Sequence, residues 1–217
     1  MHAQDQKSKT LALFDFDGTL YPHDSFTGFI FYALRKRHIV KRGIKILPWI
    51  QAYYLKLYPA HRMRPKLYAS MFKESDAEEI LQLAQDYAQQ LIPKLNSKLL
   101  DQLRQHQQLG HEAVLVSASL DLYLKPVCSY LNIDLICSEV EIKAGEITGF
   151  YQTPDCSNQQ KKLRILEKYK LQDYAEIYAY GNSDEDKEML NLAHHRYLEG
   201  RDKQLPKINI SSSSMPY

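Results

Sequence analysis

The stretch LALFDFDGTL, residues 11–20, joins an apolar run to two acids and a glycine. Thr10 to Phe16 is predicted to be a buried β-strand, and Gly18 marks the point where the chain must turn. Because residues two apart in an extended chain point to the same side, Asp15 and Asp17 are expected to project together from the strand end. Two neighbouring carboxylates there are unfavourable unless a metal ion or a proton lies between them. This spacing indicates a chemically active site.

The composition is that of a soluble globular protein. The chain has 217 residues, of which 44% are hydrophobic and 25% charged, enough for one domain with an insertion or for two small domains. Its three cysteines are odd in number and lack Cys-x-x-Cys spacing, so we expect no disulfide framework or zinc site, and a reducing, cytoplasmic location. Residues 1–10 lack the apolar core of a signal peptide, and no stretch approaches the ~20 apolar residues of a membrane span.

Helical periodicity fills residues 24 to about 92. One apolar face is formed by Phe26, Phe29, Ile30, Ala33 and Leu34. A capping-box pattern at Ser75 to Glu78 begins another helix, which Pro93 ends. This segment is predicted to be an all-helical insertion after the first strand.

From Asn96 onward, helical and strand patterns alternate. Strands are predicted at 113–116, 135–137, 176–180 and 196–198, helices at 98–109, 120–131, 159–169 and 185–193, and a β-hairpin over 140–151. The alternation predicts an α/β fold with a parallel sheet wound on both faces. In such sheets the ligand binds beyond the carboxyl ends of the strands, which places Asp17, Ser117 and Gly181 at one edge.

Three further segments carry residues suited to phosphate or metal chemistry. Ser117-Ala118-Ser119 follows a strand and offers a hydroxyl and backbone N–H groups to a phosphate oxygen, although Ser117 could instead cap the next helix. Lys161 lies on a lysine-rich helix where most lysines are solvated. Gly181 to Asp186 is dense in oxygen ligands of the kind Mg²⁺ prefers, although acids also favour a helix N-terminus.

These four segments, in this order, resemble the four motifs of the haloacid dehalogenase (HAD) superfamily of phosphohydrolases. The helical insertion, Ser-Ala-Ser, Cys156 five residues before Lys161, and Gly-Asn-Ser-x-x-Asp resemble its phosphoserine-phosphatase-like subfamily. The resemblance covers roughly residues 11–199. It implies a Rossmann-like core formed by residues 1–22 and 93–217, with a helical cap formed by residues 23–92.

The resemblance also implies a role for each matching residue. Asp15 would be the nucleophile that becomes phosphorylated, and Asp17 the general acid and base. Ser117 and Lys161 would hold the phosphoryl group, with Lys162 as the alternative lysine. Mg²⁺ would bind Asp15, the Asp17 carbonyl and Asn182, and Asp186 would orient Lys161 or metal-bound water. Substrate contacts would come from Gly18, Thr19, Asp24, Ala118 and Ser119.

Two positions depart from the family pattern. Position 182 is commonly Asp, and Asn182 lacks that charge, so weaker Mg²⁺ binding is expected unless Asp184 or Glu185 compensates. Phosphoserine phosphatases place Glu nine residues after the nucleophile, facing the substrate amine. The shorter Asp24 stands here, which weakens the argument for an amine-bearing substrate without excluding one.

The charge distribution leaves the substrate open. Net charge is +2, yet Ser25 to Lys73 holds eleven Lys and Arg and no acid, which points to an anionic partner. If the substrate is a small phosphorylated metabolite, these cations would form a solvated face of the protein. If the substrate is an anionic lipid phosphate, as in the phosphatidylglycerophosphate phosphatases that the chain also resembles, residues 35–45 would form a peripheral contact with the inner membrane surface, together with Pro48, Trp49, Tyr53, Tyr54 and Tyr58. The aromatic residues could equally form the core of the cap. No RNA-binding motif supports a nucleic-acid partner.

A non-catalytic phosphate-binding regulatory protein is the alternative of another class. The presence of both Asp15 and Asp17 argues against it.

Overall fold

A computed structural model describes residues 9–36, 48, 50–51, 55 and 58–208. Its main sheet has five parallel strands in the order β4-β3-β1-β7-β8. The strands are β1 (Lys9–Phe14), β3 (Glu112–Leu120), β4 (Asp134–Ser138), β7 (Tyr174–Gly181) and β8 (His195–Leu198). The predicted α/β fold with a parallel sheet is confirmed, and β1 occupies its centre.

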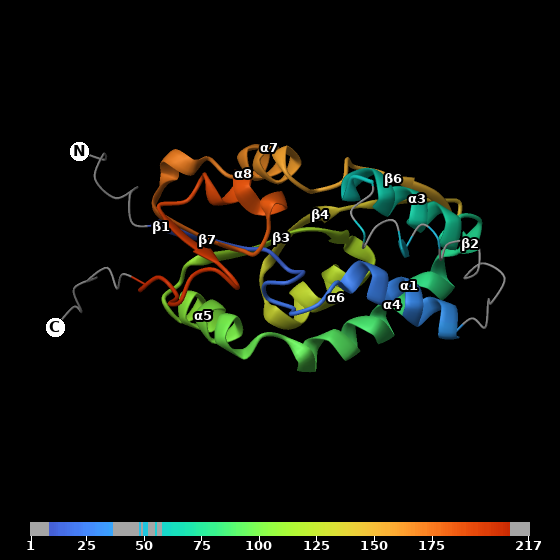
Figure 1. The fold of residues 1–217 in the computed structure, drawn as a ribbon, viewed down its shortest axis with the longest axis horizontal. Coiled ribbons are helices and arrows are strands. Elements are labelled where there is room, and N and C mark those ends of the chain that lie inside the picture. Colours follow the sequence, from blue (N-terminus) through green and yellow to red (C-terminus); the bar gives the residue numbers. More distant parts are fainter. Residues whose placement is uncertain (1–8, 37–47, 49, 52–54, 56–57, 209–217) are drawn as a thin grey trace.

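Both faces of the sheet are covered by helices, and successive side chains of β1 point alternately into an apolar cluster on each face. Leu11 and Leu13 pack with Ile165 and Met189, on the face covered by α7 (Gln159–Lys168) and α8 (Lys187–Leu190). Ala12 and Phe14 belong to the other cluster, on the face covered by α5 (Ser97–Gln108) and α6 (Asp121–Leu131). Figure 1 shows these two helical layers above and below the strands.

The insertion between β1 and α5 contains α1 (Ser25–Lys36), α3 (Ala60–Phe72), α4 (Ala77–Leu91) and the 3₁₀ turn η1 (Ile92–Lys94). It lies at one end of the molecule, beyond the main sheet (Figure 1). Phe26, Phe29, Ile30 and Ala33 of the predicted apolar face are buried in α1. Phe29 stacks on Phe72 and contacts Tyr87, so aromatic packing joins α1 to α3 and α4.

The prediction of an all-helical insertion is wrong at one point. β2 (Ser75–Asp76) pairs with β6 (Glu146–Tyr151), which pairs with β5 (Val140–Lys143), forming a three-stranded antiparallel sheet. The predicted hairpin is therefore present, but it extends the insertion instead of the main sheet. The N-cap residue of α4 is Asp76, whose Oδ1 accepts from the Glu79 N–H (2.8 Å). Ser75, with which the predicted capping box begins, pairs instead with Ile147 in the antiparallel sheet.

Other boundaries shift modestly. β3 continues through Ser117 to Leu120, with a change of register against β4 after Ser117. The predicted helix at 185–193 is a 3₁₀ turn, η3 (Asp184–Asp186), followed by the single helical turn of α8, and a further 3₁₀ turn, η2 (Leu171–Asp173), precedes β7.

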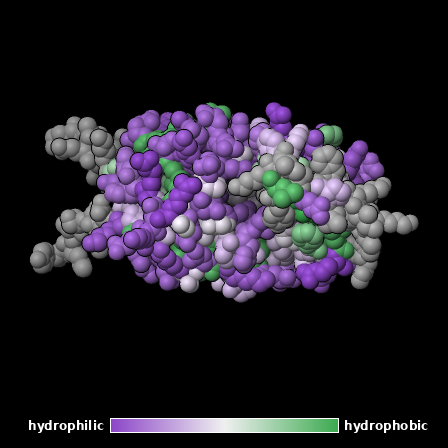
Figure 2. Space-filling view, viewed as in Figure 1, coloured by the Kyte–Doolittle hydropathy of each residue, from purple (hydrophilic) through white to green (hydrophobic). Residues whose placement is uncertain are grey.

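The predicted membrane surface falls mostly outside the described residues. Trp49, Tyr53, Tyr54 and five of the cations (Arg37, Lys41, Arg42, Lys45 and Lys56) are not among them. None of the helices formed by the described residues is long and apolar enough to cross a bilayer. Figure 2 shows a largely hydrophilic face over the core, with apolar groups on the side of the insertion, where Phe31 and Leu55 are exposed.

Gly28 determines how closely α1 approaches α4. A Cβ at this position would lie 2.2 Å from the hydroxyl oxygen of Tyr87, which donates to the Ser25 carbonyl (3.0 Å). Gly28→Ala should therefore destabilise the protein by about 1–3 kcal/mol in urea unfolding, although alanine favours helices. Adding Tyr87→Phe, which removes that hydroxyl, should recover part of the loss. A stabilised Gly28→Ala protein would show that the helices are not in close contact.

Candidate active site

The carboxyl ends of β1, β3 and β7 open into a cavity of about 610 Å³. Core residues that line it are Asp15, Asp17, Gly18, Ser117, Ala118, Ser119, Lys161, Asn182, Ser183, Asp184, Glu185 and Asp186. The insertion closes the other side with His23, Asp24, Phe26, Tyr58 and Arg64, among others. The structure thus brings most of the predicted residues to one site, at the edge expected for a parallel sheet.

Asp15 follows the last residue of β1 and is 5% exposed. One carboxylate oxygen, Oδ1, lies 2.6 Å from Lys161 Nζ, and the other accepts a hydrogen bond from the Thr19 hydroxyl (2.9 Å). Burial, reinforced by the charge of Asp186, raises the pKa of Asp15 to about 7 even though Lys161 opposes the shift. A cation that approached Asp15 would favour its ionised form.

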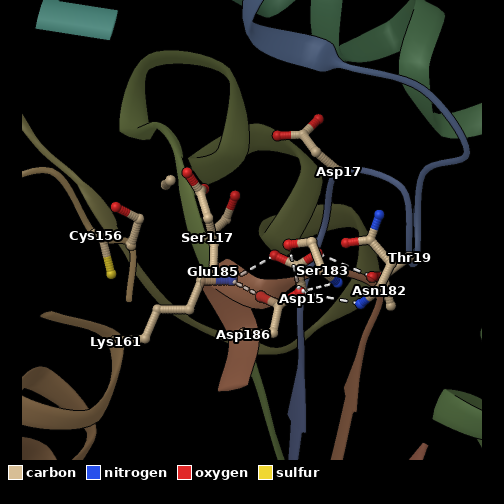
Figure 3. A network of polar contacts seen from close by, with 12 residues as sticks. Asp15, Asp17, Thr19, Ser117, Cys156, Lys161, Asn182, Ser183, Glu185 and Asp186 are labelled. Carbon is tan, nitrogen blue, oxygen red and sulfur yellow. Dashed lines mark hydrogen bonds and ion pairs between the residues drawn. The ribbon is translucent and has the colours of Figure 1, made fainter. Parts of the chain in front are cut away.

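Lys161 is the cation of the site. It comes from the first turn of α7, is 1% exposed, and lies between Asp15 and Asp186 Oδ1, 2.5 Å away (Figure 3). Burial alone would lower the pKa of Lys161, but the two carboxylates outweigh it and raise the pKa. Lys162 is partly exposed and lies 3.8 Å from Glu188, so it does not line the cavity.

Asp186 holds the loop after β7 against Lys161. Its Oδ2 accepts from the backbone N–H groups of Asn182 and Ser183, both at 3.0 Å, and from the Ser183 hydroxyl at 3.2 Å. Burial raises its pKa, but Lys161 and these donors more than offset that and lower it. Asp186 is therefore a charged residue that joins α7 to the loop carrying Asn182.

Asp17 lines the same cavity as Asp15, and its charge contributes to the raised pKa of Asp15, but the strand does not extend to it. β1 ends at Phe14, so the alternation of an extended chain does not reach residue 17. The Asp17 carboxylate instead accepts from the Ser25 N–H (2.6 Å) and from the Ser119 hydroxyl, and Figure 3 shows it apart from Asp15. Burial, together with the charge of Asp24, raises the pKa of Asp17 to about 6, which suits a group that must both donate and accept a proton.

Ser117 lies where the register of β3 changes, and its side chain is buried. Its Oγ accepts from the Ser119 N–H (3.1 Å) within the irregular end of β3, at the edge of the cavity. Leu120, not Ser117, precedes α6, so the helix-cap interpretation of Ser117 is wrong. Ser138 links the end of β3 to the segment that leads from Cys156 to Lys161. Its hydroxyl donates to the Ala118 carbonyl and accepts from the Cys156 N–H.

The oxygen-rich side of the cavity fits a hard cation. Gly18 has a φ of 76°, and a Cβ there would lie 1.9 Å from Asn182 Nδ2, so glycine lets the amide of Asn182 lie against the backbone that follows Asp17. Carboxylate, amide and backbone oxygens from Asp15, Asn182 and Asp17 are the ligands Mg²⁺ prefers. Among the described residues, no three His, Cys, Asp or Glu side chains cluster as a metal site. The expected ligand set includes an amide and a carbonyl and does not depend on such a cluster.

Two residues that the sequence did not single out, Arg64 and Asp155, form an ion-paired group with Glu185 beside the cavity. Arg64 of α3 donates from Nε and Nη2 to Asp155 (2.8 and 2.9 Å) and from Nη2 to Glu185 (3.1 Å). Arg64 is 5% exposed, so it does not belong to the solvated face that its basic neighbours suggested. Glu185 is paired with Arg64, so Asp184 is the remaining acid of the two that could compensate for the missing charge at Asn182.

Asp24 also lines the cavity. Its Oδ1 accepts from the Thr27 N–H (3.1 Å) and so caps α1, while Oδ2 is buried and accepts no hydrogen bond within the described part of the chain.

Comparison with known proteins agrees with this architecture. The model of the family described as haloacid dehalogenase-like hydrolase matches residues 12–191. The chain belongs to this family, and the expectation of an enzyme of this class is confirmed.

Individual relatives are distant but extend over most of the chain. The histidinol-phosphatase of Neisseria meningitidis serogroup C is 24% identical and covers 92% of this chain and 94% of its own length. Protein CicA of Caulobacter vibrioides is 29% identical, over 84% of this chain and 82% of its own.

Solved structures share the fold. A protein of unknown function from Bordetella pertussis Tohama I has a TM-score of 0.75 at 23% identity, covering 88% of this chain and 89% of that one. A substrate-bound phosphoserine phosphatase has a TM-score of 0.60 at 15% identity, with 88% and 85% coverage.

Lys161 and Lys162 offer a matched pair of substitutions. Lys161→Met would leave two buried carboxylates without their cation and should lower the free energy of unfolding at pH 7 by about 3–5 kcal/mol. Lys162→Met removes a partly exposed charge and should change it by less than about 0.5 kcal/mol. Urea titrations of both variants test this, and equal losses would contradict the arrangement.

Proposed function

We propose that the protein is a Mg²⁺-dependent phosphomonoester hydrolase that acts through an aspartyl-phosphate intermediate on a small phosphorylated metabolite. The observation that supports this most directly is the buried Asp15–Lys161–Asp186 cluster at the base of a cavity in a chain of the HAD hydrolase family. A nucleophilic carboxylate beside a fixed cation suits attack on a phosphoryl group. A purely phosphate-binding protein would gain nothing from a second, proton-transferring carboxylate.

In the first half of the reaction, an oxygen of Asp15 attacks phosphorus and the bond to the leaving alcohol breaks. Asp17 gives its proton to the leaving oxygen, which its raised pKa permits near neutral pH. Lys161 balances the negative charge on the phosphoryl oxygens, and the Ser117 hydroxyl and the Ala118 N–H donate to them. In the second half, Asp17 removes a proton from water as it attacks phosphorus, which releases phosphate and regenerates Asp15.

Asp15, the Asp17 carbonyl and Asn182 would hold Mg²⁺. The ion would supply positive charge between the Asp15 carboxylate and the phosphate dianion. Thr19 keeps the Asp15 carboxylate oriented by its hydrogen bond, and Asp186 keeps Lys161 in place.

Residues 1–22 and 93–217 are proposed to act as the core and residues 23–92 as a cap that determines which alcohol is accepted. The contribution of Asp24, Phe26, Tyr58 and Arg64 to the cavity supports this division. Two of the similar proteins are a histidinol-phosphatase and a phosphoserine phosphatase, both named for small phosphomonoesters, which favours a small substrate.

Asp15→Asn should abolish Mg²⁺-dependent phosphate release from p-nitrophenyl phosphate, because an amide cannot act as the nucleophile. Asp101→Asn, at an exposed position of α5, should retain the wild-type rate and controls for the lost charge. Beryllofluoride with Mg²⁺ should raise the thermal midpoint of the wild type but not of Asp15→Asn. Turnover by Asp15→Asn at the wild-type rate would contradict the aspartyl-phosphate route.

Asn182→Asp should lower the Mg²⁺ concentration for half-maximal rate several-fold, because it restores a charged ligand. Asn191→Asp adds the same charge at an exposed position outside the cavity and should have little effect. Calorimetric titration of Mg²⁺ into both variants gives a readout independent of turnover. Unchanged Mg²⁺ affinity in Asn182→Asp would mean that residue 182 does not bind the metal.

A further inference from the structure

Arg64 joins the insertion to two separate segments of the core. It comes from α3, and its Nε and Nη2 atoms donate to the two carboxylate oxygens of Asp155 (2.8 and 2.9 Å), which lies between β6 and α7. Nη2 also donates to Glu185 of η3 (3.1 Å). The Arg64 and Asp155 side chains are only 6% and 5% exposed. A two-point contact at this depth fixes the direction of both side chains, because opening it would leave buried charge unpaired.

The two core segments that Arg64 contacts carry two of the charges at the centre of the site. The first contains Asp155 and leads into α7 with Lys161, and the second contains Asp186 directly after Glu185. The segments meet at the Lys161–Asp186 ion pair (2.5 Å). They also meet through the backbone, because the Asn158 N–H donates to the Glu185 carbonyl (2.9 Å). The insertion therefore adds a third link between the same two segments.

The segment before α7 depends on such contacts because it has no regular structure of its own. Residues 152–158 lie between β6 and α7. Asn158, the last of them, has a φ of 51°, a backbone conformation that residues other than glycine rarely adopt. Such a conformation persists only where the surrounding structure fixes it. The Asn158 carbonyl accepts from the Lys161 N–H (3.2 Å), so the conformation of this segment is coupled to the position of Lys161.

From these contacts we infer that Arg64 is a positioning residue of the proposed phosphatase, an inference that rests on the proposed function. By holding Asp155 and Glu185, Arg64 keeps the segment before α7 and the loop after β7 in their relative positions, so that Lys161 faces the phosphoryl group. The insertion thus supplies a residue that completes the phosphate-binding arrangement of the core. Arg64 touches none of the reacting atoms in this role.

Direct contact between Arg64 and the substrate is the competing role, since Arg64 lines the cavity. The two roles predict opposite effects for the acid that holds Arg64. If Arg64 binds the substrate, neutralising Asp155 would free the guanidinium and should maintain or improve catalysis. If Arg64 is a positioning residue, neutralising Asp155 removes the same contact and should impair catalysis as the loss of Arg64 does.

Steady-state kinetics with p-nitrophenyl phosphate test this inference. Arg64→Met should lower kcat about 10- to 100-fold and change KM by less than about threefold, because a displaced Lys161 stabilises the transition state less. Arg64→Lys should recover only part of the rate, since an ammonium group cannot make the two-point contact. Arg104→Met, which removes an exposed charge from α5, should retain the wild-type rate. A wild-type kcat in Arg64→Met would overturn the inference.

Asp155→Asn separates the positioning role from substrate binding. It should lower kcat several-fold, and in a double-mutant cycle its effect should largely disappear in the Arg64→Met background, because both substitutions break one contact. The loss of kcat/KM in Arg64→Met should agree within about threefold for p-nitrophenyl phosphate and glycerol 3-phosphate, which share only the phosphoryl group. Undiminished kcat in Asp155→Asn, or a loss in Arg64→Met confined to one ester, would show that Arg64 binds the substrate.

Hydrogen–deuterium exchange gives a readout that does not depend on turnover. In Arg64→Met, peptides covering residues 155–161 and 182–186 should exchange faster than in the wild type, whereas a peptide covering residues 112–116 should be unchanged. Unchanged exchange in the first two peptides would overturn the inference. A uniform increase in all three would show a loss of global stability, which likewise contradicts a positioning role.

Phosphate release by the wild type separates this inference from the proposed function. If the wild type hydrolyses p-nitrophenyl phosphate and Arg64→Met does so equally well, the inference fails and the proposed function stands. If the wild type releases no phosphate, both fail. Should Arg64→Met not fold, as circular dichroism would reveal, the Arg64→Lys and Asp155→Asn values decide the question.

Discussion

Lys161 lies between Asp15 and Asp186 in the interior of the protein, and this arrangement of one cation with two carboxylates constrains everything around it. Burying three charges away from water has a large unfavourable desolvation free energy. Ion pairing offsets it only when each charge lies close to its counterpart and its remaining polar atoms are hydrogen-bonded. Thr19 supplies that bond to Asp15, and the loop after β7 supplies three to Asp186. Segments far apart in sequence are thus fixed together before any substrate arrives.

The sequence contained enough information to predict the elements that build this cluster. Residues 11–14 form an unbroken apolar run, which predicts a buried strand. The regular change from helical to strand periodicity after Asn96 predicts a parallel sheet, whose strand ends must meet at one edge. For these reasons Asp17, Ser117 and Gly181 could be placed at one edge without coordinates, whereas Lys161 was assigned to the site only by the resemblance to the HAD motifs.

Other features could not be predicted, because they depend on contacts that leave no local pattern. Arg64 stands among ten other cations between Ser25 and Lys73, and only the fold brings it to Asp155 and Glu185, far along the chain. Ser75 and Asp76 are too short a segment to show strand alternation, so their pairing with β6 was unforeseen. The hydrogen bonds of Asp17 to Ser25 and Ser119 could not be predicted from strand alternation, because β1 ends at Phe14.

The bond between Asp17 and the N–H of Ser25 links the chemistry to the insertion. Asp17 takes its proton-transfer position partly from Ser119 of the core and partly from the first residue of α1. Displacement of α1 would therefore leave the acid without one of its two anchors. Under the proposed mechanism, proton transfer by Asp17 would therefore depend on how α1 packs against the core, so a substitution in α1 could change the rate without touching the phosphate.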